Sequence, residues 1–194
     1  MSAELGEIDE VATKKTFERT QPALMACYTT GLDRVEYMAG DVKFFIRVKA
    51  DGRMRWGFLE QSTLGDRTTE TCMLGVLGAT QWPLPEGGEA EVHQSLGFDP
   101  PPGVRPPADW SPDKVKAAIN LKAAEASACK KHGAGVFPIT AYVREEHGAG
   151  HVVAAGAAAP TGAAAPDVDC ILGVVRAMKL PTPGSYAAKV SFSL

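Results

Sequence analysis

The chain has 194 residues, of which 45% are hydrophobic and 22% are charged, a composition that suits one globular domain or two small ones. Its net charge of −3 is uneven, because residues 1–99 carry 16 acidic and 10 basic side chains (−6) whereas residues 100–194 carry 7 and 10 (+3). No dense run of Lys and Arg and no stretch of 18 apolar residues occurs, so neither a nucleic-acid partner nor a membrane span is expected.

The chain begins with a predicted helical region over about residues 8–30. Pro22 is expected to break this helix, with Thr20 capping the second segment. Apolar and polar residues then alternate over residues 42–49, which predicts a strand with one buried face. Asp51-Gly52 predicts a two-residue hairpin turn, so a return strand follows it.

A short apolar helix is predicted from Cys72 to about Thr80, followed by a strand around Val92. Five prolines within residues 99–109 then favour an extended, stiff linker. Ser111 can cap the next predicted helix, which should reach about Lys131.

The remaining elements repeat the earlier order. A second hairpin is predicted over residues 137–153, and a second cysteine-led helix runs from Cys170 to about Lys179 before a strand around Val190. Between them, residues 160–166 have small side chains with little to bury, and we expect a mobile loop there.

This order reflects an internal repeat. Residues 72–85 and 170–183 agree at seven of fourteen positions, including a cysteine, a glycine and two prolines. The sequence therefore predicts an α+β protein with two tandem repeats, residues 1–98 and 110–194, each a three-stranded antiparallel sheet packed by two helices. The shared glycines, Gly75 and Gly173, are expected to let each helix approach its sheet closely.

Four cysteines follow the same duplication, which places one pair in each repeat: Cys27 with Cys72, and Cys129 with Cys170. As disulfides, each pair would stabilise its repeat by about 4 kcal/mol on the chain-entropy model. Buried free thiols are the alternative, whereas a zinc site lacks the close cysteine spacing it needs. Disulfides indicate an oxidising compartment, although the first residues do not form a signal peptide; we expect a signal or anchor to have been removed.

No catalytic, cofactor or metal motif stands out. The glycine-rich segments 132–135 and 147–150 fit a helix end and a hairpin turn better than an oxyanion loop. Glu60, Asp66 and Glu70 could form an acid–base group, but a loop that caps the following helix fits them better. The sequence thus predicts a protein that is not an enzyme and holds no cofactor or metal.

Trp82 precedes Pro83-Leu84-Pro85 and is replaced by Leu180 in the second repeat. A buried apolar anchor fits both residues. An exposed indole that grips a partner fits only Trp82, which is therefore a candidate partner-binding residue.

The first repeat resembles the C-terminal domain of AgmX/PglI gliding-motility proteins of myxobacteria, a family similar to the TonB C-terminal domain. The matching residues are Cys27-Tyr28, Leu32, Gly40 to Ile46, Asp51-Gly52, Ser62 to Leu64, Cys72 and Pro83 to Pro85. The resemblance implies two tandem TonB-like domains in a periplasmic or envelope protein that binds partner proteins without catalysis. It also implies that a partner strand can add at a sheet edge.

We therefore expect an interaction module whose exposed sheet edges bind an extended segment of an envelope protein. Two alternatives stay open. The repeats or copies of the chain could pair edge to edge in a self-associated structure, or a cysteine pair could act as a thiol switch.

Overall fold

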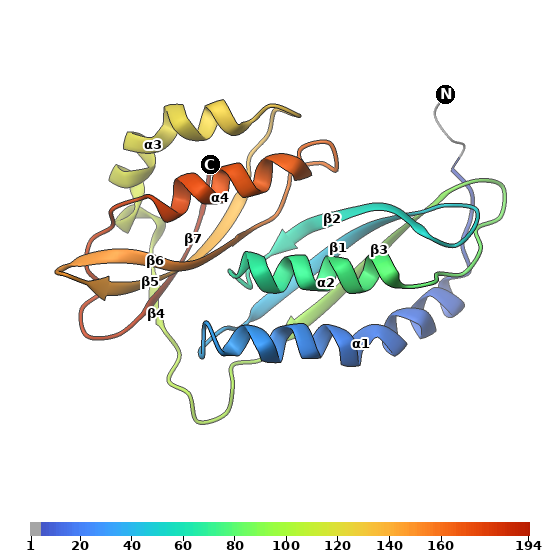
Figure 1. The fold of residues 1–194 in the computed structure, drawn as a ribbon, viewed down its shortest axis with the longest axis horizontal. Helices are drawn as coiled ribbons and strands as arrows, with labels where there is room; N and C mark the ends of the chain where they lie inside the picture. The colour runs from blue at the N-terminus through green and yellow to red at the C-terminus, as the bar shows by residue number, and fades with distance from the viewer. Residues whose placement is uncertain (1–4) are drawn as a thin grey trace.

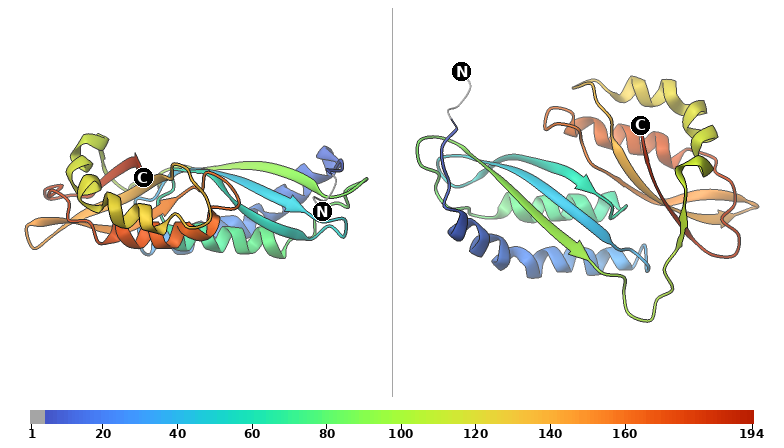
Figure 2. Two further views of the ribbon diagram at one scale, coloured as in Figure 1. Left: turned by 90° about the horizontal axis from the view of Figure 1, so that it is seen from above. Right: turned by 180° about the vertical axis from the view of Figure 1, so that it is seen from behind.

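A computed structural model of the chain describes residues 5–194 and shows a mixed α+β protein (Figure 1). In the first repeat, the three strands form an antiparallel sheet in the order β2-β1-β3, and Figure 2 shows both helices on one side of it. The elements are α1 (Glu10–Leu32), β1 (Gly40–Val48), β2 (Met54–Ser62), α2 (Arg67–Ala79) and β3 (Ala90–Phe98).

The second repeat has the same helices and strands with one addition. Its sheet has the order β4-β7-β5-β6, and the extra strand β4 comes from the end of the predicted linker. The expectation of three strands in this repeat is therefore wrong. The elements are β4 (Ala108–Trp110), α3 (Lys116–Cys129), β5 (Pro138–Glu146), β6 (Ala149–Ala157), α4 (Val168–Arg176) and β7 (Ala188–Ser193), with 3-10 turns at Pro112–Lys114 and Ala165–Asp167.

The alternation in β1 sets the orientation of the first sheet. Val42, Phe44, Ile46 and Val48 are at most 1% exposed and pack in the same apolar cluster as side chains of α1 and α2. The side chains between them lie on the opposite face of the sheet. One face of β1 is therefore buried under the two helices, and the opposite face is available for other contacts, such as that of Phe45 with the second repeat.

Helix α1 is continuous from Glu10 to Leu32, so the expected break at Pro22 is wrong. Thr20 does not cap a new segment; its hydroxyl donates to the carbonyl of Phe17 at 2.6 Å. Phe17 before the proline and Leu24 after it are both buried in the first core. Burial on both sides of Pro22 keeps the helix unbroken despite the missing N–H.

Both disulfides join the two helices of a repeat. Cys27 of α1 is bonded to Cys72 of α2, and Cys129 of α3 is bonded to Cys170 of α4, with Cα–Cα distances of 5.8 and 5.6 Å. In each pair the first cysteine is buried and the second is exposed. Two disulfides of this kind are typical of proteins that fold in an oxidising compartment.

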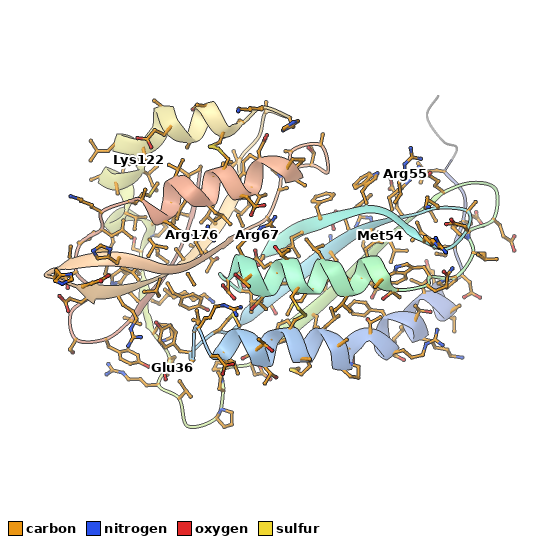
Figure 3. The ribbon with its side chains drawn as sticks, in the orientation of Figure 1. Glu36, Met54, Arg55, Arg67, Lys122 and Arg176 are labelled. Atoms are coloured by element: carbon orange, nitrogen blue, oxygen red, sulfur yellow. A yellow bond between two sulfur atoms is a disulfide. The ribbon has the colours of Figure 1, made fainter. Side chains whose placement is uncertain are left out.

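The repeats pack against each other. Tyr142 of β5 belongs to the apolar cluster of the first repeat, while Phe45 and Phe58 of the first sheet belong to that of the second. The backbone N–H of Ala159 donates to the carbonyl of Leu59 at 3.0 Å, a single main-chain hydrogen bond between the repeats. Arg67, labelled in Figure 3, forms an ion pair with Asp169 of α4 at 2.8 Å.

The segment 160–166, for which the sequence predicts a mobile loop, is packed in part against the first sheet. Ala164 is fully buried, and Gly162 lies so close to the ring of Trp56 that a Cβ at this position would clash with it. The small side chains let this backbone approach an aromatic residue of the first sheet. These small side chains bury little surface of their own, but their close approach covers part of the surface of Trp56.

Gly75 and Gly173 do not serve close helix packing. A Cβ placed on either glycine would meet nothing within 4 Å, because both lie on exposed helix surfaces. The expectation that they permit a close approach to the sheet is wrong.

Candidate binding edge

The outer edge of β3 has no strand paired to it from Ala90 to Phe98, and residues 5–7 pair with residues 86–89 just before it. Its nine residues pair with β1 from Gly40↔Phe98 to Val48↔Ala90. Within residues 5–194, the backbone groups of β3 have no hydrogen-bonding partner other than β1. Because alternate residues of an edge strand direct their N–H and C=O groups outward, this edge can pair with a further strand.

The opposite edge of the first sheet, on β2, is covered at both ends. The N–H of Trp82 donates to the carbonyl of Gly52 at 2.8 Å, near the hairpin turn. At the other end, the carbonyl of Leu59 accepts from Ala159 of the second repeat. An incoming strand would have to displace parts of the protein itself from β2.

The edge of the second sheet that corresponds to β3 is already occupied. Ala90 and Val92 of β3 match Ala188 and Val190 of β7 in the repeat. On β7 this edge pairs in parallel with β4, with Ala108 opposite Ala188 and Trp110 opposite Val190. The linker thus adds its own strand at the edge that stays open in the first repeat.

A cavity of about 340 Å³ lies between the open edge and the start of α1. It is lined by Ile8, Glu10, Thr13 and residues 91–94 of β3. Thr13 is only 4% exposed, and its hydroxyl has no hydrogen-bonding partner. A buried polar group of this kind stands out, because nearly all buried polar side chains in proteins are paired.

Charged side chains on the open face of the first sheet are paired across its strands. Arg47 of β1 donates to Glu89 at 2.9 Å and to Glu91 at 2.8 Å, and the bond from Arg47 is the main reason that the pKa of Glu89 is lowered. Glu60 is bonded to His93 at 2.9 Å and lies 3.2 Å from the ammonium of Lys43. Partial burial opposes ionisation of Glu60, but the hydrogen bonds from His93 and Lys43 outweigh it and lower the pKa of Glu60.

The three acidic residues considered as an acid–base group are in different places. Glu60 lies on the open sheet face, whereas Asp66 caps α2 by accepting from the N–H of Thr69 at 3.2 Å, as the sequence predicts. Glu70 is fully buried between the repeats. They do not converge on one reaction centre.

Glu70 links α2 to the second sheet. Its carboxylate accepts from the hydroxyl of Ser62 at 2.5 Å and from the N–H of Ala157 in β6 at 3.3 Å. Burial raises its pKa to about 7, because two hydrogen bonds and the nearby Arg67 only partly replace lost hydration. At neutral pH this contact between the repeats is therefore close to its titration point.

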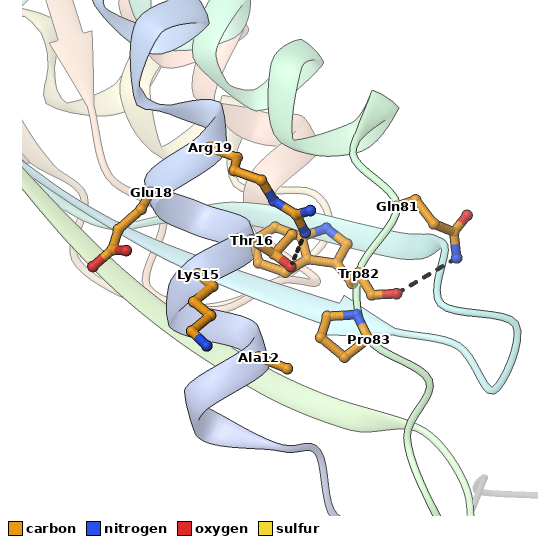
Figure 4. A pocket seen from close by; sticks show the side chains of 8 residues that line it. All are labelled: Ala12, Lys15, Thr16, Glu18, Arg19, Gln81, Trp82 and Pro83. Carbon is orange, nitrogen blue, oxygen red and sulfur yellow. Dashed lines mark hydrogen bonds between the residues drawn. The ribbon is translucent and has the colours of Figure 1, made fainter.

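Trp82 is buried to 2% exposure, and its indole N–H donates to the carbonyl of Leu77 at 3.2 Å. The prediction of an exposed indole that binds a partner is therefore wrong. Trp82 is a buried apolar anchor, which was the alternative prediction. Figure 4 shows Trp82 and Pro83 beneath Arg19 of α1, at one side of an open groove of about 720 Å³. The indole holds the segment after α2 against α1.

The residues that the sequence did not single out are Glu10 and Thr13. Thr13 lies one helical turn before Phe17, on the buried side of α1. A polar residue on the apolar stripe of an amphipathic helix was the available signal. No group of three or more His, Cys, Asp and Glu residues within residues 5–194 could hold a metal ion, and no helix there is long and apolar enough to cross a membrane.

Comparisons with protein-family models, with curated proteins and with solved structures find no match for this chain.

Proposed function

We propose that this chain is a non-enzymatic interaction module that binds an extended segment of a partner protein as an added strand on the outer edge of β3. The observation that carries the proposal is the open nine-residue edge beside a cavity. Main-chain pairing would supply affinity in such a complex, and pockets for alternate side chains would supply selectivity.

The second repeat supports this mode of binding from within the same chain. Strand β4 adds to β7 as an extended, proline-flanked segment at the edge equivalent to β3. The fold therefore accepts a strand at this edge without distortion of the β5–β7 register, which runs from Pro138↔Ser193 to Val143↔Ala188. By analogy, the ligand of the first repeat is an extended segment from another protein.

The compartment is part of the proposal. Disulfides in both repeats support an oxidising location outside the cytoplasm. Together with the resemblance to the AgmX/PglI and TonB-like domains, they favour the periplasm or cell envelope, where the partner would be an envelope protein.

Hydrogen exchange tests the mode of binding directly. Peptides selected from a display library of extended segments should slow the exchange of alternate β3 amides, because an added strand bonds only every second residue. The amides of β7 serve as the internal control, since β4 already occupies that edge. Peptides that bind but protect no β3 amide, or a library that yields no binders, would refute the proposal.

The same edge supports a second candidate, self-association. Two copies could pair β3 with β3 in a two-fold arrangement, because this edge has no partner within residues 5–194. Light scattering over a dilution series decides this, since a monomer at every concentration excludes such a dimer.

A further inference from the structure

A cavity of about 360 Å³ lies where the two repeats and the linker meet. Loops of the first repeat, three prolines of the linker and strand β7 line it, and Figure 1 shows the linker passing from the end of β3 to β4 beside this junction. Strand β7 contributes Lys189 and Ser191 from the face turned toward the first repeat, because the alternate residues Val190 and Phe192 are buried in the second core. The cavity has the size of a small-molecule pocket, and such pockets are common between domains.

Lys189 supplies a cation to this cavity. Its ammonium donates to the carbonyl of Ala39 at 2.7 Å, and its other two N–H groups have no partner within residues 5–194. Burial lowers the pKa of Lys189, and the charges of Asp109 and Asp41 oppose this shift without forming an ion pair with the ammonium. A partly buried cation that lacks a neighbouring carboxylate is stabilised by an anion bound beside it.

Two hydroxyl groups add donors to the same cavity. Thr63 accepts from the N–H of Asp41 at 2.9 Å, and its own hydroxyl hydrogen is donated to no group of the described chain. Ser191 is bonded to Thr140 at 2.9 Å, a contact that uses only one of the two hydroxyl hydrogens of the pair. An ammonium and two hydroxyls around one cavity suit a carboxylate, which only accepts hydrogen bonds.

Asp109 supplies the opposite charge at the edge of the cavity. It lies opposite Lys189 in the parallel β4–β7 pair, so the two side chains share one face of the sheet. Within residues 5–194 the carboxylate of Asp109 has no hydrogen bond and no ion pair, since Lys189 is directed to Ala39 instead. A simple anion in the cavity would be repelled by Asp109. A ligand with an ammonium next to its own carboxylate complements both residues.

The rest of the lining is mainly apolar and includes Tyr37, Pro100, Pro106 and Pro107. These side chains suit a hydrocarbon group rather than a further charge. We propose that the cavity binds a free α-amino acid with an apolar side chain, whose carboxylate lies at Lys189 and whose ammonium lies at Asp109. The cavity shares no residue with β3, so this binding is independent of strand addition.

Three small probes test the proposal by NMR titration of the whole, oxidised protein. L-Leucine carries both charges, isocaproate lacks the ammonium, and isopentylamine lacks the carboxylate, while all three keep the same branched hydrocarbon group. We expect leucine to bind at least about tenfold more tightly than either of the others, because each deletion removes a charge-assisted contact. Equal binding of leucine and isocaproate, or no saturable binding of leucine, overturns the proposal.

Two variants assign the contacts. Asp109→Asn should weaken the binding of leucine and strengthen that of isocaproate, because the amide no longer repels an anion, and a gain of binding cannot result from misfolding. Lys189→Met keeps an apolar stem and should abolish the binding of both carboxylates. The matched controls are Asp33→Asn and Lys114→Met, at exposed residues outside the cavity, and both should leave every affinity unchanged. A ratio of leucine to isocaproate affinity that Asp109→Asn does not change overturns the proposal, whereas strand addition at β3 is unaffected by either outcome.

Discussion

Replacing the buried Glu70 by glutamine should remove most of the pH dependence of stability near neutrality. Glutamine has almost the same shape, can accept from the N–H of Ala157, and can bond to the hydroxyl of Ser62 without carrying a charge. The other charged groups near Glu70 are Asp66, which raises its pKa, and Arg67, which lowers it. Both remain in the variant.

The size of the effect follows from the pKa of Glu70, which rises from an ordinary 4.5 to about 7 on folding. The folded state therefore binds more protons than the unfolded state between these values, and the free energy of unfolding falls as pH rises through this window. A shift of this size corresponds to about 3 kcal/mol, lost at up to about 1.4 kcal/mol per pH unit. Below pH 4.5 and above about pH 7.5, this group contributes no further slope.

Urea unfolding of the oxidised protein, measured from pH 4.5 to 8.5, is the assay. Glu70→Gln should match the wild type at the acidic end and exceed it by about 3 kcal/mol at pH 8, equivalent to roughly 6–12 °C in Tm for a chain of this size. Glu60→Gln is the matched control, because the pKa of Glu60 is lowered and its loss cannot reproduce the gain. Parallel pH profiles for wild type and Glu70→Gln would refute the reasoning.

Three further predictions concern packing, capping and the disulfides. A Cβ on Gly156 would clash with the Glu70 carboxylate, so Gly156→Ala should lower stability by about 1–3 kcal/mol, whereas Gly75→Ala, which faces open space, should raise it by about 0.5–1 kcal/mol in the same urea titration. Asp66→Ala removes the cap of α2 and the ion pair with Arg34 at 2.6 Å, and circular-dichroism melting should show a loss of about 1–2 kcal/mol. Removing the Cys27–Cys72 bond by a double alanine substitution should cost about 2–4 kcal/mol by calorimetry, and a stability equal to that of the wild type would contradict a structural role for the bond.

The internal repeat made much of the fold predictable. Agreement at residues such as Cys72 and Cys170 fixed the order of elements in both halves, and alternation in β1 fixed its buried face. These features depend on local pattern and on duplication. Neither requires knowledge of what lies beside the repeat.

The errors concern residues whose role is set by distant neighbours. Pro22 predicts a helix break because the local rule does not include the core, formed with the distant strands, in which Phe17 and Leu24 on either side of it are buried. From the sequence, Trp82 could be either exposed or buried. Its hydrogen-bonding partner, the carbonyl of Leu77, becomes evident only from the path of the chain after α2. The Thr13 cavity was missed because the β3 residues that line it, 91–94, lie more than seventy residues after Thr13 in the chain.

Small residues of the second repeat form part of its contact with the first repeat. Gly156 lets β6 approach the carboxylate of Glu70, and Gly162 lets the following segment lie against Trp56. Both glycines therefore lie in the contact between the two repeats. The end of the linker lies along the second sheet, where β4 pairs with the edge of β7. Of the two edges that correspond in the repeats, the one on β7 is occupied by β4, whereas no strand is paired to the one on β3 within residues 5–194.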